Sequence, residues 1–386
     1  MITKITIKNY KSIEKIDLSL GRINVFIGEN GAGKSNILEA IALAGAASAG
    51  KLDNEFLASR GIRVTSPTLM RSNFPDCIDD KSDIDIDIFE GTKAEHKFIL
   101  KNDNTDYSQW EYKNKKENQL VELKKVIEKI SESNKRAKVI LKEEALNDLL
   151  AQMEQYDFLL ESGKFVKLNR FVIYSLENSA LRTFEKEGQI QPLGINGEGL
   201  LKLLTVLSQS EHSATLNEIK SHLSVLGWFK DFNVVPSNNN ETSISIADRF
   251  LSEERPFFDQ KSANEGFLYL LFYYALFASK LTPSFFAIDN IDVSLNPKLC
   301  TRLIQSLVAL AKTNDKQAIL TTHNPALLDG LNLDDDDQRL FVVSRDSEGK
   351  TRIKRMKKPV LKEGFTQPKL SAMFMNGSLG GLPKGF

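Results

Sequence analysis

Short runs of alternating apolar and polar residues dominate the first hundred positions of the chain. A period of two is typical of half-buried strands, and a continuous apolar run is typical of a fully buried one. The pattern predicts strands over residues 2–8, 16–20, 22–27, 83–89 and 96–101. A helix rich in alanine, leucine and isoleucine is predicted between the third and fourth strands, at 37–46. The last two strands, joined by a turn with a glycine, indicate an antiparallel sheet.

Residues 111–165 have a different pattern, with apolar residues three and four positions apart among many charges. Leu120, Leu123 and Ile127 fall on one face of a helix, and a polar break at 131–136 precedes a second helical stretch. We therefore predict a helical hairpin inserted into the domain. Its charges balance, which favours a solvated arm or lid over an arm that binds a partner or dimerises.

After this insertion the chain alternates between apolar strands and helices. Strands are predicted at 171–175, 243–247, 284–288 and 317–321, and helices at 200–207, 216–226, 266–279 and 298–312. Such alternation implies an α/β fold with a doubly wound sheet, whose ligands bind at the carboxyl ends of the strands. We divide the chain into the N-terminal part of this domain, the insertion, the remainder of the domain, and a basic C-terminal strand and tail, at 1–110, 111–165, 166–345 and 346–386.

Composition narrows the class of protein without identifying a partner. The 386 residues carry 51 Lys plus Arg and 51 Asp plus Glu, so the formal net charge is zero and any surface for nucleic acid must be a local patch. The two cysteines, Cys77 and Cys300, match no metal-ligand spacing. The sequence pattern contains no secretory or membrane-spanning segment, so we expect a cytoplasmic protein without a membrane partner.

A glycine-rich loop carries the most specific chemical signal. Residues 28–35 read Gly-Glu-Asn-Gly-Ala-Gly-Lys-Ser and fit the P-loop pattern, between a predicted strand and a predicted helix. The backbone N–H groups of such a loop bind phosphate oxygens, the lysine supplies a cation for the outer phosphates, and the serine hydroxyl binds Mg²⁺. We assign ATP and Mg²⁺ as cofactors, and the nucleotide-binding residues as Asn30, Gly31, Ala32, Gly33, Lys34, Ser35 and Asn36.

Two later strands end in residues that would complete such a site. Residues 285–288 are apolar and lead to Asp289, which we assign as a magnesium ligand together with Ser35. The strand that ends in Thr-Thr-His323 brings an imidazole to the same edge of the sheet. There it can face a γ-phosphate or an attacking water.

These motifs resemble the ABC-type ATPase heads of the RecF, Rad50 and SMC group, and more closely the compact bacterial branch that includes OLD-type and other antiphage ATPases. The resemblance implies a P-loop ATPase head with a mixed sheet, an antiparallel β subdomain and a helical insertion. It places the signature loop at Ser262, Asn264, Glu265 and Gly266, and the D-loop at 294–297. In such families the signature loop of one protomer completes the ATP site of another, which implies a homodimer or a higher homo-oligomer.

The catalytic position departs from the family pattern. The family usually has Asp-Glu after this strand, with the glutamate as general base, whereas this chain has Asp289-Asn290. An amide does not take up a proton, and loss of such a base removes a contribution of about 100- to 10,000-fold. We therefore expect slow or absent hydrolysis unless Asp292 substitutes, with Asn290, Asp292 and His323 as the residues around the reacting water. Asn264, where serine is usual, is a second departure.

Three functions remain open. The first is an ATP-binding sensor or scaffold of a bacterial antiphage defence complex, similar to Septu-type ATPases, which regulates a separate nuclease of the HNH type. The second is a RecF-like repair ATPase that binds duplex DNA on ATP-dependent dimerisation. The third is a transport ATPase with a membrane partner, which fits the opening strands and the imperfect signature poorly. The sequence offers no acidic constellation for a nuclease centre, so effector activity is expected in another polypeptide.

The C-terminal stretch at 349–365 has seven basic residues against one acid. Such a charge run favours a solvated final hairpin and tail over contact with DNA or an acidic partner.

Overall fold

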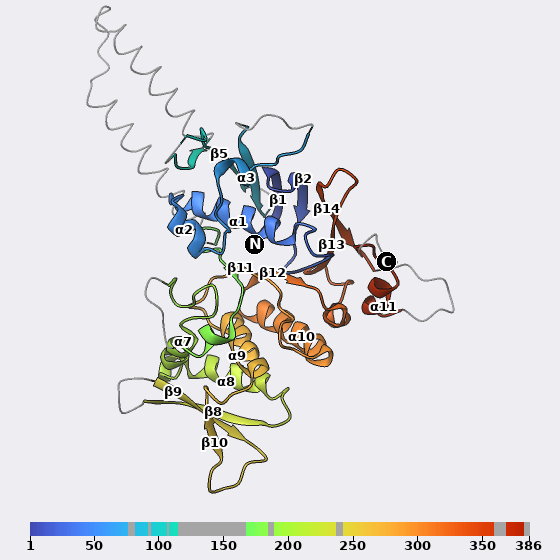
Figure 1. Ribbon diagram of the computed structural model, residues 1–386. Coiled ribbons are helices and arrows are strands. Elements are labelled where there is room, and N and C mark those ends of the chain that lie inside the picture. The colour runs from blue at the N-terminus through green and yellow to red at the C-terminus, as the bar shows by residue number, and fades with distance from the viewer. Residues whose placement is uncertain are drawn as a thin grey trace, which may run out of the picture.

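A six-stranded sheet in the order β14-β13-β3-β12-β11-β7 forms the centre of the computed structural model (Figure 1). Its strands are β3 (Ile23–Ile27), β7 (Ile173–Tyr174), β11 (Phe285–Ile288), β12 (Gln317–Thr322), β13 (Gln338–Arg345) and β14 (Thr351–Met356). All neighbours are parallel except β14, which pairs antiparallel with β13. The structure describes residues 1–75, 82–91, 94–105, 108–114, 167–183, 189–236, 242–358 and 368–381.

Both faces of this sheet are covered, because its inner strands are apolar along their whole length. Side chains alternate between the two faces of a strand, so neighbouring residues belong to different cores. Phe26 and Phe285 pack into the first core, whereas Val25 and Phe286 pack into the second. This double burial explains why the strands read as continuous apolar runs in the sequence.

The first core holds helix α1 (Lys34–Ser48) between the central sheet and a second, antiparallel sheet (Figure 1). Helix α1 is buried on nearly all sides, and a Cβ on its Gly45 would lie 2.7 Å from the carbonyl oxygen of Leu168. The antiparallel sheet has the order β2-β1-β4-β5-β6. Its strands are β1 (Ile2–Tyr10), β2 (Ile13–Ser19), β4 (Ile84–Glu90), β5 (Ala94–Lys101) and β6 (Glu111–Asn114), and the short helices α2 (Asn54–Ser59) and α3 (Pro67–Met70) follow α1.

The second core is formed by helices on the opposite face of the central sheet. Helix α9 is apolar all round and is buried from Phe267 to Ala278, as expected of a helix inside a core. The helices in this part of the fold are α6 (Asn178–Leu181), α7 (Leu200–Leu207), η1 (Ser210–His212), α8 (Ser213–Leu223), α9 (Glu265–Ala278), α10 (Pro297–Thr313), η2 (Pro325–Gly330) and α11 (Leu370–Met375). Helix α9 itself contacts α6, α7, α8 and α10. A small antiparallel sheet of β8 (Phe229–Pro236), β9 (Thr242–Asp248) and β10 (Phe257–Asp259) lies beyond them (Figure 1).

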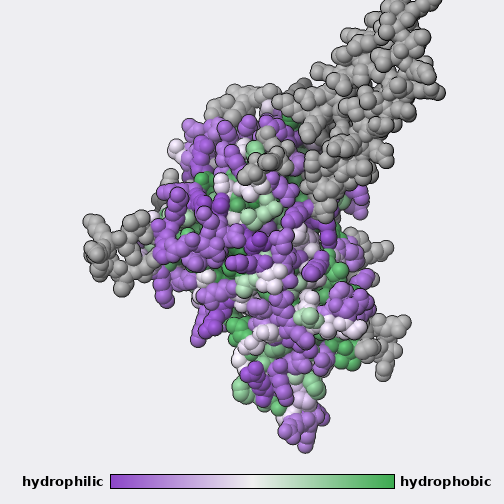
Figure 2. Space-filling view, turned by 180° about the vertical axis from the view of Figure 1, so that it is seen from behind, coloured by the Kyte–Doolittle hydropathy of each residue, from purple (hydrophilic) through white to green (hydrophobic). Residues whose placement is uncertain are grey.

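The surface is mainly hydrophilic in the view of Figure 2, and its apolar residues gather in the lobe that holds the small sheet. Phe250 is 81% exposed and Phe257 is 53% exposed at this end of the molecule. Within the described residues, no helix is long and apolar enough to cross a membrane.

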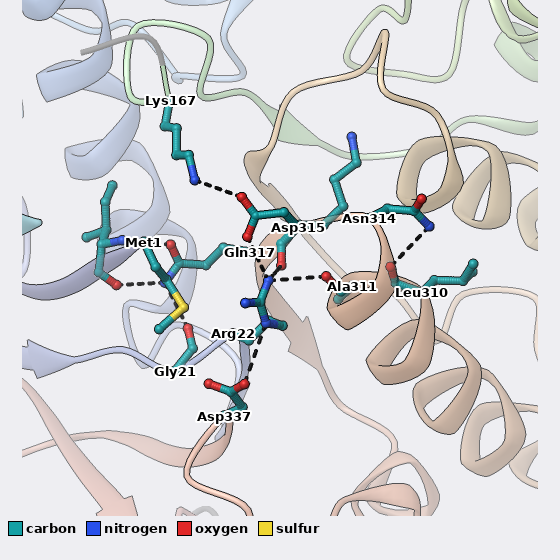
Figure 3. A network of polar contacts seen from close by, with 12 residues as sticks. Met1, Gly21, Arg22, Lys167, Leu310, Ala311, Asn314, Asp315, Gln317 and Asp337 are labelled. Atoms are coloured by element: carbon teal, nitrogen blue, oxygen red, sulfur yellow. Dashed lines mark hydrogen bonds and ion pairs between the residues drawn. The ribbon is translucent and has the colours of Figure 1, made fainter. Parts of the chain in front are cut away.

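A polar network connects the amino ends of the central strands (Figure 3). Arg22, just before β3, donates to the carbonyl of Ala311 at 3.2 Å and to the carboxylate of Asp315 at 3.1 Å. Lys167 donates to the other oxygen of Asp315 at 3.1 Å, and this bond together with Arg22 lowers the pKa of that carboxyl. The network holds the turn between α10 and β12 against β3. The carboxyl ends of the same strands, at the opposite edge, carry the candidate site.

The α/β fold with a mixed sheet and an antiparallel subdomain is confirmed, and every strand and helix predicted within the described ranges is present within about three residues. Residues 111–114, the start of the predicted helical insertion, instead form β6, because they pair with β5. The rest of the predicted hairpin lies outside the described residues. Strands β8 and β10 have no counterpart in the sequence prediction.

The basic C-terminal stretch is only partly solvated. Lys350 has a side chain that is 4% exposed and forms ion pairs with Glu14 and Glu348, both at 2.9 Å. The prediction of a solvated hairpin is therefore wrong at this residue, because the carboxylates come from β2 and from the β13–β14 turn. Arg352, Arg355 and Lys358 pair with Asp346, Asp336 and Asp334.

Candidate nucleotide-binding site

The glycine-rich loop after β3 is packed closely against the C-terminal hairpin. A Cβ on Gly28 would lie 2.0 Å from the carbonyl oxygen of Val343 in β13. Gly33 has a φ of 104°, and a Cβ there would lie 2.2 Å from Thr351 Oγ1 in β14. Only glycine fits these two positions. The predicted loop residues Asn30 and Gly31 are exposed at its tip, and Ala32 is buried beneath them.

Lys34 begins α1 and lies inside the loop. Its Nζ donates to the carbonyl oxygens of Gly28 at 2.8 Å and Glu29 at 3.0 Å. Burial lowers the pKa of Lys34, while the nearby charges of Asp289 and Glu29 oppose that shift. The first N–H groups of α1 have no acceptor within the helix, and the helix dipole is positive there. Loop, lysine and helix terminus together form a site for phosphate groups.

Ser35 and Asp289 meet across the sheet although 254 residues separate them. Ser35 Oγ donates to Asp289 Oδ2 at 2.9 Å, and the other carboxylate oxygen accepts from Thr321. The contact follows from topology, because β3 and β11 both flank β12 and all three are parallel. A hydroxyl and a carboxylate are hard oxygen ligands of the kind that Mg²⁺ binds beside a phosphate. Both predicted magnesium ligands therefore fit such an ion.

The predicted catalytic residues lie at the same edge of the sheet. Asn290 has a φ of 53°, and its N–H donates to Thr321 Oγ1 at 2.8 Å. Asp292 accepts from Thr322 Oγ1 at 2.6 Å and from the His323 N–H at 3.3 Å, through one of its two oxygens. Partial burial and the charge of Lys34 lower the pKa of His323, which favours its neutral imidazole.

A cavity of about 290 Å³ opens beside Ser35 and Asp289, and residues that the sequence analysis missed line it. Glu39 is only 2% exposed; it accepts from Arg63 Nε at 2.5 Å, from Tyr10 Oη at 3.1 Å and from Lys11. The Arg63 side chain is 65% exposed and borders the cavity. The available signal was a single acid inside an otherwise apolar helix. No local motif identifies its basic partners.

A second cavity of about 430 Å³ is lined by Asn36, and Arg63 borders both cavities. Asn36 Nδ2 donates to Ser12 Oγ at 2.7 Å, and Arg345 Nε donates to the Gly31 carbonyl at 2.7 Å. The cavity is lined by these residues together with basic side chains and one aromatic ring, Lys11, Arg63, Arg71 and Phe74 among them. A polar, basic groove with an aromatic edge suits the ribose and base of a nucleotide whose phosphates lie in the loop.

The four signature-like residues lie elsewhere, at the start of α9. Asn264 accepts from the Phe267 N–H at 2.9 Å and so caps the helix, a role that asparagine fills as well as serine. Ser262 donates to Asp259 through both its N–H and its hydroxyl. Neither cavity near the P-loop is lined by Ser262, Asn264, Glu265 or Gly266. One copy of the described chain thus brings together every predicted site residue except this loop.

The central sheet and the phosphate-binding loop have the P-loop ATPase fold that is seen in Smc head domains. Parallel strands carry the loop, the carboxylate and the histidine to one edge, and an antiparallel subdomain covers α1. More specifically, the chain belongs to the family described as "AAA domain, putative AbiEii toxin, Type IV TA system", which it matches over residues 23–329.

Solved structures and curated proteins agree with this class. The chain is similar to an Smc head bound to the C-winged helix domain of ScpA (TM-score 0.54, 15% identity, 92% of this chain and 98% of that chain). It is also similar to an Smc head from Pyrococcus furiosus bound to the C-terminal domain of ScpA (TM-score 0.51, 14% identity, 92% and 96%). Among curated proteins, it is 42% identical over 55 residues to the DNA replication and repair protein RecF of Bacillus thuringiensis and Bacillus cereus strains. That match spans 14% of this chain and only 15% of each RecF protein.

Proposed function

We propose that the chain is an ATP-binding subunit that assembles head to tail when ATP and Mg²⁺ bind, and that it hydrolyses ATP slowly or not at all. The observation that carries the proposal is Asn290. It directly follows the carboxylate that contacts Ser35, where an amide replaces the family's general base. Bound ATP then persists and holds an assembled state. The Ser262–Gly266 loop of a second copy supplies the side of the site that one copy lacks.

We further propose that this assembly is the sensor or scaffold of a bacterial antiphage defence complex and regulates a separate nuclease effector of the HNH type. The resemblance to compact antiphage ATPases supports this role. The family description also names a toxin and a type IV TA system.

The test is the mass of the affinity-purified protein, measured with and without ATP and Mg²⁺. We expect a nucleotide-dependent increase in mass and a co-purified nuclease, identified by mass spectrometry. Lys34→Ala removes the cation of the phosphate site and abolishes the increase, whereas Lys51→Ala, an exposed lysine after α1, leaves it unchanged. A mass that is the same with and without nucleotide refutes the assembly, and a complex without a nuclease refutes the proposed effector.

A second candidate is a RecF-like ATPase that grips duplex DNA, favoured by the 55-residue RecF match. Some charges of the antiparallel sheet argue against DNA contact on that surface, because aspartates lie opposite two of its lysines. Lys8 lies opposite Asp85 in the sheet register, and Asp87 lies opposite Lys97. ATP-dependent binding to plain duplex DNA, weakening steeply with salt, would favour this candidate.

A further inference from the structure

Arg182, at the end of α6, binds the backbone of the loop that precedes α9. Its Nη1 donates to the carbonyl oxygens of Gln260 at 2.5 Å and Lys261 at 2.8 Å, and its Nη2 donates to that of Ala263 at 2.8 Å. Its Nε donates to Asn178 Oδ1 at 3.1 Å, which fixes the plane of the guanidinium. One side chain therefore restrains three peptide groups of a single loop.

The bonds from Arg182 fix the direction of a backbone N–H group in the loop before α9. A trans peptide group is planar, so its C=O and N–H point in opposite directions. Because the Ala263 carbonyl faces Arg182, the Asn264 N–H points away from it. The next residue begins α9, whose first N–H groups have no acceptor within the helix. The Phe267 N–H is bound by Asn264 Oδ1, so the Asn264 N–H, which points away from Arg182, is a donor that could receive a phosphate oxygen.

The segment that ends in Arg182 begins at the nucleotide cavity. The Asp289 N–H donates to the carbonyl of Tyr174 in β7 at 2.8 Å, and Ser175 lines the same cavity as Ser35. One residue later, the Leu176 carbonyl accepts from Tyr269 Oη on α9 at 3.1 Å. A short stretch of chain therefore contacts both the protomer's own nucleotide site and the helix that carries its signature-like loop.

We propose that Arg182 is a positioning residue that holds the loop before α9 ready to receive the γ-phosphate of ATP bound to a second copy of the chain. Residues 174–182 connect this loop to the protomer's own nucleotide site. The inference rests on the proposed head-to-tail assembly. Loss of Arg182 leaves ATP binding by the protomer's own P-loop intact and removes its contribution to the partner's site.

The first experiment compares Arg182→Ala and Arg182→Lys with Lys261→Ala, which removes an exposed cation from the same loop. At low protein concentration we expect all three variants to bind a fluorescent ATP analogue within about twofold of the unaltered chain, since the P-loop is untouched. The ATP-dependent assembly of Arg182→Ala weakens by at least about tenfold, because three hydrogen bonds from a charged donor are lost. Arg182→Lys also weakens it, since an ammonium lacks the planar fork. Lys261→Ala assembles normally.

The second experiment tests whether Arg182 acts on the nucleotide site of its own protomer or on that of the partner. Differently tagged Lys34→Ala and Arg182→Ala chains are mixed with ATP, and only mixed pairs are captured. In such a pair, the intact P-loop of the Arg182→Ala chain faces the intact loop before α9 of the Lys34→Ala chain. The pair therefore contains one complete site, forms with ATP and retains one nucleotide. A mixed pair of the unaltered chain and the double variant Lys34→Ala/Arg182→Ala contains none and does not form.

The outcomes distinguish the two proposals. If the unaltered chain shows no assembly with ATP, the proposed function fails and the role of Arg182 fails with it. If the unaltered chain assembles and Arg182→Ala assembles at the same ATP concentration, or the two tagged mixtures behave alike, only the inference about Arg182 is overturned. Unfolding of Arg182→Ala in urea at the same midpoint as Lys261→Ala shows that its lost assembly is not a folding defect.

Discussion

Replacement of Asn290 by glutamate is expected to raise the rate of ATP hydrolysis. The residue follows Asp289 at the carboxyl end of β11, where the family's general base is located. A positioned base contributes about 100- to 10,000-fold to a rate. At about 1.4 kcal/mol for each factor of ten, the carboxylate would lower the barrier by about 3 to 5.5 kcal/mol.

The backbone conformation of residue 290 determines how much Asn290→Glu destabilises the fold. Asn290 has a φ of 53°, a left-handed conformation that asparagine adopts more easily than glutamate. The strain of the longer side chain lowers the free energy of unfolding by about 1 kcal/mol. The hydrogen bond from the Asn290 N–H to Thr321 is retained, because it uses only the backbone of residue 290. Asn290→Asp tolerates the same backbone more easily but places its carboxylate one methylene short.

The assay is phosphate release at saturating ATP and Mg²⁺, with Asn290→Gln as the matched control for side-chain length. We expect Asn290→Glu to exceed both the unaltered chain and Asn290→Gln by at least about 100-fold. Equal rates for Asn290→Glu and Asn290→Gln would refute the assignment of this position to the base. So would turnover of several per second in the unaltered chain that Asn290→Ala leaves unchanged.

Three further predictions test the site and its support. Asp289→Asn removes a magnesium ligand, so the ratio of nucleotide affinities with and without Mg²⁺, measured by calorimetry, should fall towards one; an unchanged ratio would contradict its role. Glu39→Gln leaves the partly buried amine of Lys11 without its counter-charge, and the free energy of unfolding in urea should drop by about 2 kcal/mol; a loss below about 0.5 kcal/mol would show that the pair is not needed. Burial lowers the pKa of Lys316 to about 7, below about 10.4 in the unfolded chain, so the unfolded state binds more protons between these values. Stability in urea should therefore rise by about 2 kcal/mol from pH 7 to pH 9, and Lys316→Met, but not the exposed-site control Lys312→Met, should abolish that rise.

The phosphate and magnesium half of the site was predictable because it depends on strand order. A loop after one parallel strand and an acid after another must meet at the carboxyl edge of the sheet. Residues 28–35 and Asp289 satisfy that rule, and Ser35 and Asp289 do lie in contact. The long apolar strands and helices were predictable for the same reason, since burial on both faces leaves a continuous pattern in the sequence.

The features that the sequence did not predict depend on contacts between residues that are distant in the chain, and such contacts leave no local pattern. Arg63 lies in a connection after α2, and its ion pair with Glu39 exists only once α1 packs beneath the antiparallel sheet. Arg182 binds backbone carbonyls, which any sequence in the loop would supply, so nothing in residues 260–263 marks its partner. Strand β10 has only three residues, too few for a period of two to be recognised.

The run of basic residues in the C-terminal hairpin predicted a solvated surface. That prediction was wrong at Lys350, because its acidic partner Glu14 is distant in the sequence. The hairpin's basic residues form a cluster along the chain, but Lys350 is buried against Glu14 from the opposite end of the protein. The residues on either side of it contact the P-loop: Thr351 Oγ1 donates to the Ala32 carbonyl at 3.0 Å, and Arg345 donates to the Gly31 carbonyl. Because Lys350 is already paired within the chain, this buried ion pair holds the hairpin in place. The basic stretch therefore belongs, in part, to the support of the nucleotide site.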